Sequence, residues 1–422
     1  MISKWAWHLK RLTRKLWLRA ALISLLAVAA ALGSLVVSPL LPPGLSAQIG
    51  ADAVDNILNI IATSMLTVTT FSLSTMVAAY AAATSNVTPR ATRLLIEDTT
   101  TQNVLATFVG SFLYSLVAII TLSMGAYGER GRVVLFAVTI VVIILIVMTL
   151  LRWIDYLLRL GRVGETTQQV EKATTEAMRI RKKTPNLGGV PIEQAESGIP
   201  RNASPIFTDT IGYVQHIDVD ALNDYAVEAK GRIYLAALPG TFIDPKRPLA
   251  WCSGLNETPD AATIIAAFTI GEDRSFDQDP RFGLCVMAEI AQRAMSPAVN
   301  DPGTAIDVIG RAVRVLSIWA EPDAEAEVQF NSIFVPSIDI ADLFDDVLTP
   351  LARDAAGSVE VQIRLQKAYS ALARIGDARY EAVAKRHSKA AIERVRAAMT
   401  SSHDVQRVVD AAKFVGRTTG QK

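Results

Sequence analysis

Residues 133–151 read VVLFAVTIVVIILIVMTLL, nineteen residues without one charged side chain. A hydrocarbon core of roughly 30 Å needs about 20 helical residues to cross it, so this run predicts a membrane-spanning helix. A barrel strand would alternate in polarity, and this run does not. Three other stretches without Asp, Glu, Lys or Arg precede it, at 20–41, 56–89 and 99–128. The sequence therefore predicts four transmembrane helices, at about 20–41, 56–83, 102–126 and 133–153.

The charges beside these stretches predict how they are oriented. The segment before the first stretch is basic, whereas the loop 42–55 has no basic residue and carries Asp52 and Asp55. Short basic flanks stay in the cytoplasm, so both termini and the region after residue 151 are expected there. Arg130 and Arg132, between the third and fourth stretches, are the exception. The basic flanking residues are Lys4, Lys10, Arg11, Arg14, Lys15, Arg19, Arg90, Arg93, Arg152, Arg159 and Arg162.

A cleaved signal peptide is the alternative interpretation of the amino terminus, because a basic segment precedes an apolar run. The apolar run 20–41 has 22 residues. Signal-peptide cores have roughly 7 to 15, so the length favours a retained transmembrane helix.

The second predicted span has an unusual composition. Eight of the thirteen residues from 63 to 75 are Ser or Thr. Four of them recur at spacings of four, three and four, which places them on one face of a helix. Such a face either packs against neighbouring helices or lines a path for a solute in an oligomer. The candidate path-lining residues are Thr63, Thr67, Thr70 and Ser74.

The remaining composition excludes several classes of function. Lys and Arg total 42 against 41 Asp and Glu, which does not indicate a nucleic-acid partner. The two cysteines and four histidines lack the spacing of a metal site. No phosphate-binding glycine loop, serine-hydrolase elbow or two-histidine zinc helix occurs. The sequence thus identifies neither a catalytic residue nor a cofactor.

The second half of the chain predicts a mixed domain. Residues 161–203 form a juxtamembrane helix and a linker rich in Pro and Gly. Residues 204–270 form a small β-rich subdomain, with strands at 211–217, 232–238 and 263–270. Residues 271–422 have helical periodicity. The fold class is therefore a mainly α membrane protein, in which four transmembrane helices precede a cytoplasmic α+β domain with a helical carboxyl-terminal array.

Two polar clusters flank the predicted helix 282–295. The Asp-Pro pairs at 279–280 and 301–302 are typical helix starts, in which Asp is the cap and Pro the first helical residue. The alternative is a ligand site that brings both clusters together around an ion or a polar molecule. The candidate residues are Arg274, Asp277, Gln278, Asp279, Ser296, Asn300, Asp301 and Thr304.

Four strings give the chain a family resemblance: 71–90, which begins Phe-Ser-Leu-Ser, Gly-Tyr-Val-Gln-His-Ile-Asp at 212–218, Arg-Ser-Phe-Asp-Gln-Asp-Pro at 274–280 and Ser-Pro-Ala-Val-Asn-Asp-Pro-Gly-Thr-Ala at 296–305. The chain resembles a bacterial family of predicted integral membrane proteins, a domain of unknown function with the motif Ser-Pro-x-x-Asn-Asp-Pro-x-Thr-Ala. Ser275 stands where the family more often has Thr, which keeps the hydroxyl. The resemblance implies a multi-pass protein of the bacterial cytoplasmic membrane, and it assigns no catalytic residue.

Three functions remain open from the sequence. The first is a homo-oligomeric channel or transport-related protein, in which the second span lines the path and the cytoplasmic domain senses or gates. The second is a membrane-anchored scaffold or ligand sensor. The third is an enzyme at the membrane face, with a divalent metal among the acidic residues of 272–279. The lipid bilayer and further copies of the chain are the expected partners.

The orientation is testable with reporter fusions. Green fluorescent protein fused after Lys422 should fluoresce, and alkaline phosphatase fused there should be inactive, because that enzyme needs an oxidising compartment. A phosphatase fusion inside 42–55 is the control and should be active. Phosphatase activity at the carboxyl terminus would contradict the predicted orientation.

Overall fold

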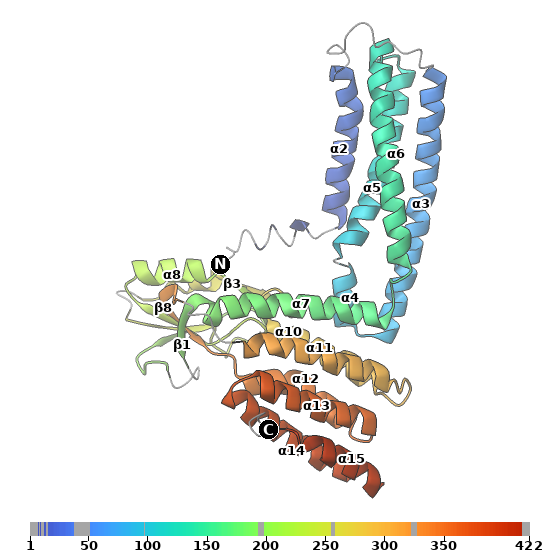
Figure 1. Cartoon of the computed structure of the whole chain (residues 1–422). Helices are drawn as coiled ribbons and strands as arrows, with labels where there is room; N and C mark the ends of the chain where they lie inside the picture. Colours follow the sequence, from blue (N-terminus) through green and yellow to red (C-terminus); the bar gives the residue numbers. More distant parts are fainter. Residues whose placement is uncertain are drawn as a thin grey trace. The chain divides into compact units, whose positions relative to one another are not determined.

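The structure, a computed structural model, describes residues 7, 9, 12–13, 16–37, 51–96, 98–192, 198–254, 258–321 and 327–415. It divides into two compact units (Figure 1). We call residues 8–85 and 92–165 the membrane unit, and residues 1–7, 86–91 and 166–422 the C-terminal unit. Parts of the sequence predictions lie outside the described residues: the basic residues Lys4, Lys10, Arg11, Arg14 and Lys15, the end of the first span at 38–41, the loop 42–50 and linker residues 193–197.

The membrane unit contains four long apolar helices, which confirms the predicted architecture. Within the described residues, each is long and apolar enough to cross a membrane. A short helix, which the sequence did not reveal, precedes the third of them. The helices are α2 (Leu16–Val37), α3 (Ala51–Asn86), the short α4 (Pro89–Ile96), α5 (Thr99–Ser123) and α6 (Glu129–Leu157).

Buried polar side chains connect these helices to one another. Trp153 Nε1 of α6 donates to Ser72 Oγ of α3 over 2.9 Å. The hydroxyls of Tyr114 on α5 and Thr139 on α6 are 2.9 Å apart. Without water to bond, a polar group inside a helix bundle needs a protein partner, so these pairs fix how the helices meet.

The C-terminal unit contains two small sheets. The five-stranded sheet has the order β1-β8-β4-β6-β2, and the three-stranded sheet the order β5-β3-β7. β8 pairs in parallel with β1 and β4, while the other pairings are antiparallel. The strands are β1 (Gly189–Ile192), β2 (Ser204–Ile206), β3 (Gly212–Ile217), β4 (Arg232–Leu235), β5 (Phe242–Ile243), β6 (Ala250–Ser253), β7 (Phe268–Gly271) and β8 (Phe330–Pro336).

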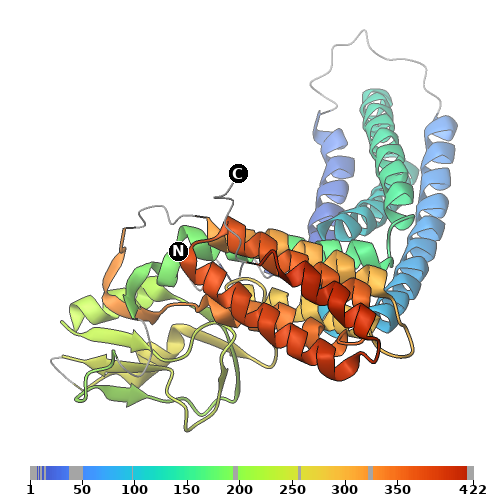
Figure 2. The same cartoon turned by 60° about the horizontal axis from the view of Figure 1, so that its bottom comes forward.

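Helices make up the rest of this unit. α10 packs on α11 and α12, and α13 packs on α11, α14 and α15, so that the helices run side by side with the strands at one end (Figure 2). The helices are α7 (Val163–Lys183), α8 (Val219–Glu228), α9 (Ala261–Ala266), α10 (Pro280–Ala294), α11 (Pro302–Ala320), α12 (Ile340–Asp354), α13 (Val359–Ile375), α14 (Ala378–Ala398) and α15 (Ser402–Ala412).

Two findings differ from the sequence interpretation. The predicted strand 263–270 begins as helix α9, because Asp260 accepts hydrogen bonds from Ala262 N and Thr263 N and so caps a helical turn. Only its last part is strand β7. The five-stranded sheet also includes β1 and β8, which lie outside 204–270. Strand β8 lies between β1 and β4 in the sheet but follows helix α11 in the chain.

α7 and α10 approach each other closely. A Cβ atom on Gly283 of α10 would lie 2.0 Å from Thr174 Oγ1 of α7, so only glycine fits at this contact. The close approach brings the end of α7 beside the start of α10, where the candidate site lies.

Candidate functional site

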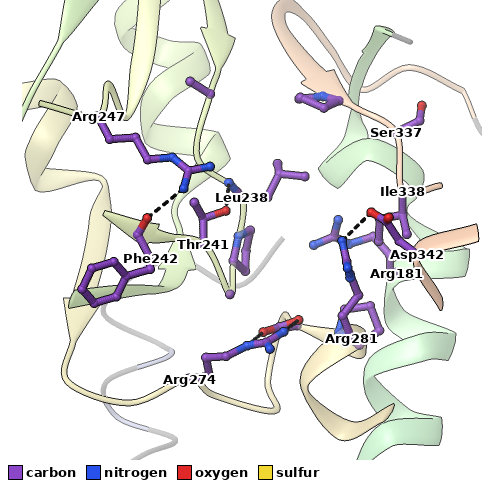
Figure 3. Close-up of a pocket in the computed structure, with 16 residues that line it drawn as sticks. Arg181, Leu238, Thr241, Phe242, Arg247, Arg274, Arg281, Ser337, Ile338 and Asp342 are labelled. Carbon is purple, nitrogen blue, oxygen red and sulfur yellow. Dashed lines mark hydrogen bonds and ion pairs between the residues drawn. The ribbon is translucent and has the colours of Figure 1, made fainter. Parts of the chain in front are cut away.

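A pocket of about 380 Å³ lies inside the C-terminal unit. One wall is the segment from the end of β4 through β5, and the other is formed by α7, the start of α10 and the segment from β8 into α12 (Figure 3). The pocket therefore lies between the strands and the helical array. Its charged lining residues are Arg181, Arg247, Arg274, Arg281, Asp279 and Asp342.

Asp279 holds Arg274 at the floor of the pocket. Arg274 Nε and Nη2 donate to the two carboxylate oxygens over 2.8 and 3.1 Å, a bidentate pair. The same carboxylate accepts from Phe282 N over 3.1 Å, which caps α10 as the sequence predicts. Asp279 is 2% exposed, and burial raises the pKa of its carboxyl while Arg274 opposes the rise. The pair is thus a structural part of the pocket.

Arg281 has two carboxylate partners. Its Nη1 donates to Asp342 over 2.6 Å, and its Nε and Nη2 donate to Asp346 over 2.7 and 3.1 Å. Both aspartates belong to α12, so the arginine joins the first turn of α10 to α12. Every nitrogen of this guanidinium has a carboxylate partner.

Arg181 differs from these two arginines. It is 5% exposed, and its Nη2 donates over 2.9 Å to the carbonyl oxygen of Gln278. Within the part of the chain that the structure describes, no carboxylate lies within ion-pair distance of it. Burial lowers the pKa of Arg181 to about 10, and the charge of Asp279 offsets part of that decrease. A buried cation without an ion pair is costly, so its presence requires an explanation.

Arg247 lies at the rim of the pocket. Its Nη1 donates to the carbonyl oxygen of Phe242 over 3.1 Å, and the side chain is exposed. Among the described residues it too has no carboxylate partner. The pocket lining thus has four arginines and two aspartates, and it keeps an excess of one positive charge when Asp346, the second partner of Arg281, is counted.

The structure separates the two polar clusters that the sequence grouped as one possible site. Asp279 lies before the first residue of α10, whereas Ser296, Asn300 and Asp301 follow its last residue. A helix of 15 residues is about 22 Å long, so one small ligand cannot contact both ends. Arg274 and Asp279 line the pocket, and Gln278 Oε1 accepts from Ile217 N over 3.1 Å instead.

The second cluster forms the turn into α11. Asp301 accepts from Thr304 N over 3.0 Å and from Thr304 Oγ1 over 2.6 Å, which confirms the predicted cap. Asn300 has a φ of 47°, the left-handed conformation that Asn tolerates better than most residues. Ser296 Oγ donates to the carbonyl of Arg293 over 2.6 Å. Each of these residues has a local role in the turn.

Asp277 accepts a hydrogen bond from Trp7. Trp7 Nε1 donates to Asp277 Oδ2 over 3.1 Å, and its ring lies 5.3 Å from that of His216. Trp7 is 3% exposed, so its side chain is buried in the C-terminal unit. Asp277 and Asp279 therefore have different partners. No group of three or more His, Cys, Asp or Glu among the described residues is placed to hold a metal ion.

The candidate path-lining residues of α3 lie on one exposed face. Thr63, Thr67, Thr70 and Ser74 are exposed, whereas Met65 and other residues of the opposite face are buried. Thr67 Oγ1 donates to the carbonyl of Thr63 over 3.0 Å, and Thr70 Oγ1 to that of Leu66 over 3.0 Å. These hydroxyls are satisfied by their own helix, as is usual in apolar surroundings.

Sequence reasoning missed four of the six charged pocket residues: Arg181, Arg247, Arg281 and Asp342. They come from four separate segments, and none belongs to a motif. The one local signal was Arg281, which directly follows the Asp-Pro pair that starts α10.

Replacement of Asp301 by Ala should lower the free energy of unfolding by about 1 kcal/mol, the usual value of a helix cap. The hydroxyl and N–H of Thr304 lower the pKa of Asp301 in the folded state. The stabilisation is therefore complete above the unfolded carboxyl value of about 3.9 and is lost as the pH falls through the lower folded value. Denaturant unfolding of the parent and of Asp301→Ala, near neutral pH and at a pH below the folded pKa of Asp301, measures the difference in the free energy of unfolding. Asp209→Ala, at an exposed position, is the control. If Asp301→Ala lowered the free energy of unfolding equally at a pH below the folded pKa of Asp301, the cap would not depend on the ionised carboxylate.

Comparison with known proteins places the chain in a family. Residues 13–371 match the family described as predicted membrane protein (DUF2254). Uncharacterized proteins of Mycobacterium tuberculosis and Mycobacterium bovis are each 27% identical to the chain over 273 residues, 63% of the chain and 52% of the relative. The chain thus spans about half the length of these curated relatives. No solved structure matches it. The family match confirms the resemblance found in the sequence, and the chain belongs to the DUF2254 family of predicted membrane proteins.

Proposed function

We propose that this protein is a membrane-anchored sensor that binds a small anionic ligand in the pocket of its C-terminal unit. The observation that carries the proposal is Arg181, a buried guanidinium that has a backbone carbonyl but no carboxylate partner among the described residues. An anion that enters the pocket would supply the missing charge. Carboxylates and phosphates match the planar fork of arginine best.

The position of the pocket supports a sensing role. Its two walls belong to different parts of the unit, one to the strands and the other to helices α7, α10 and α12. A ligand that contacts both walls binds more tightly when the walls are close together, so it shifts the population toward a closed arrangement. Basic residues beside the predicted spans support a cytoplasmic location for this unit, and we propose the bacterial inner membrane as the site of the protein.

Anion binding should raise the unfolding midpoint of the purified full-length chain in detergent. At ten times Kd a ligand stabilises the folded state by about 1.4 kcal/mol. Inorganic phosphate and short carboxylates are the probes, with chloride at equal ionic strength as the reference. Arg181→Met should abolish the shift, whereas Arg179→Gln, an exposed position on the same helix, should keep it.

The variant also distinguishes a binding role from a structural one. Replacement of a poorly paired buried charge by an apolar side chain is often neutral or stabilising, so Arg181→Met should unfold no earlier than the parent without ligand. A parent protein that responds to no anion, or an Arg181→Met variant that responds as the parent does, would remove the proposal.

An oligomeric channel is a second candidate, favoured by the exposed face of α3. In a single chain, Thr63, Thr67, Thr70 and Ser74 lie on the outer surface of the membrane unit. Association of several copies around an axis could turn this face toward a shared path, where the hydroxyls could exchange their helix bonds for bonds to a solute.

Flux assays in proteoliposomes test this second candidate. If the face lines a path, Thr67→Leu and Thr70→Leu should lower flux severalfold, because each removes a hydroxyl and adds apolar bulk. Val141→Leu, at an exposed apolar position on α6, is the control and should leave flux unchanged. Parent protein without flux, or threonine variants that conduct normally, would exclude the channel.

A further inference from the structure

The four arginines of the pocket differ in how many donors they have left. Arg274 donates two hydrogen bonds to the carboxylate of Asp279. All three nitrogens of the Arg281 guanidinium donate to Asp342 and Asp346. The first pair is neutral, and Arg281 with its two aspartates carries one net negative charge, so neither group has positive charge left for a ligand. Ligand charge must therefore be matched by the other two arginines.

Among the described residues, Arg181 and Arg247 each have one hydrogen bond, in both cases to a backbone carbonyl, over 2.9 and 3.1 Å. A guanidinium has five N–H donors, so each retains donors for a ligand. Within the described residues, they are also the two lining arginines that no carboxylate neutralises. The pocket thus has two separate positions where an anionic group gains charge-assisted hydrogen bonds.

These two arginines lie on opposite walls. Arg181 projects from the α7 side and Arg247 from the strand side, as Figure 3 shows. Arg181 is buried, whereas Arg247 is exposed at the rim. Apolar residues of both walls, among them Leu238 and Ile338, also line the pocket. A ligand that satisfies both arginines needs anionic groups at two ends, separated by a short uncharged part.

The volume of the pocket supports a ligand larger than one oxyanion. A water molecule occupies about 30 Å³ of the liquid, so a pocket of about 380 Å³ holds the equivalent of roughly a dozen waters. A single phosphate ion would leave most of this space to solvent. The size is within the range of pockets for small organic ligands, roughly 300–1,000 Å³.

We infer that the ligand is a small organic molecule with two anionic groups, a dicarboxylate or a phosphorylated carboxylic acid, with one group at Arg181 and the other at Arg247. We call such a ligand a dianion for its two anionic groups, whatever the charge of each. The inference rests on the proposed anion-binding function and adds to it the class of ligand. The buried group provides most of the affinity, because a desolvated ion pair is stronger than one at the rim. The contact between the outer anionic group and Arg247 makes the pocket prefer ligands that have a second anionic group.

Isothermal titration of the full-length protein in detergent tests the inference. The probes are linear dicarboxylates with two to six methylene groups, and 3-phosphoglycerate. Each is paired with its singly charged counterpart, the matching monocarboxylate or glycerate, and inorganic phosphate is the single-oxyanion reference. The dianions should bind about fivefold more tightly than their counterparts, the upper size expected for one ion pair at the exposed rim. Among the dicarboxylates, one chain length should bind best.

Three variants separate the possible outcomes. Arg247→Gln should reduce the preference for dianions to about twofold or less while monoanions bind as before, because only the outer contact is lost. Arg181→Met should abolish binding of both classes. Lys246→Gln, an exposed neighbour outside the lining, is the control.

Equal binding of monoanions and dianions by the parent, or a dianion preference that survives Arg247→Gln, would overturn the dianion inference and leave the anion sensor standing. Absence of binding by every probe, with no stabilisation by any anion, would overturn both. A preference for 3-phosphoglycerate over all dicarboxylates would identify the phosphorylated class, and the opposite preference would identify the dicarboxylates.

Discussion

The carboxylate of Asp279 is the interaction on which the C-terminal unit most depends. It binds Arg274 through both oxygens, caps α10 at Phe282 N and lies close enough to Arg181 to offset part of the burial cost of that side chain. It also requires glycine at position 240, because a Cβ atom on Gly240 would lie 2.1 Å from Asp279 Oδ2. Gly240 has a φ of +94°, a conformation that glycine adopts without strain. One buried charge therefore sets the helix start, the loop opposite and the floor of the pocket.

Features with a local cause could be predicted from the sequence. The charge-free stretches predicted four apolar helices, and the structure has them. The Asp-Pro pairs predicted two helix starts, since a cap and the first helical residue are neighbours in the chain. Asp260 shows the limit of this reasoning: its cap starts α9 in a segment whose apolar residues indicated a strand. A short apolar run fits either structure, and the cap decided between them.

The candidate site could be predicted only in part. Arg274 and Asp279 stood out because they share one short polar string. Arg181, Arg247 and Arg281 come from α7, the loop after β5 and α10, and only the tertiary fold brings them to one pocket. The five-stranded sheet could not be predicted for the same reason, because its strand β8 pairs in parallel with β4 across about a hundred residues that include three helices. The grouping of both polar clusters into one site failed for a geometric reason, since the whole length of α10 stands between them.

The anchoring of Trp7 imposes an order on biosynthesis. Its partner Asp277 lies 270 positions later, beyond all four apolar helices. At about 10 residues per second, the ribosome needs roughly half a minute to reach that position after Trp7 has emerged. Until then the indole cannot make this bond, and all four apolar helices are translated first. The hydrogen bond from Trp7 to Asp277 can therefore form only after the whole membrane unit has been translated.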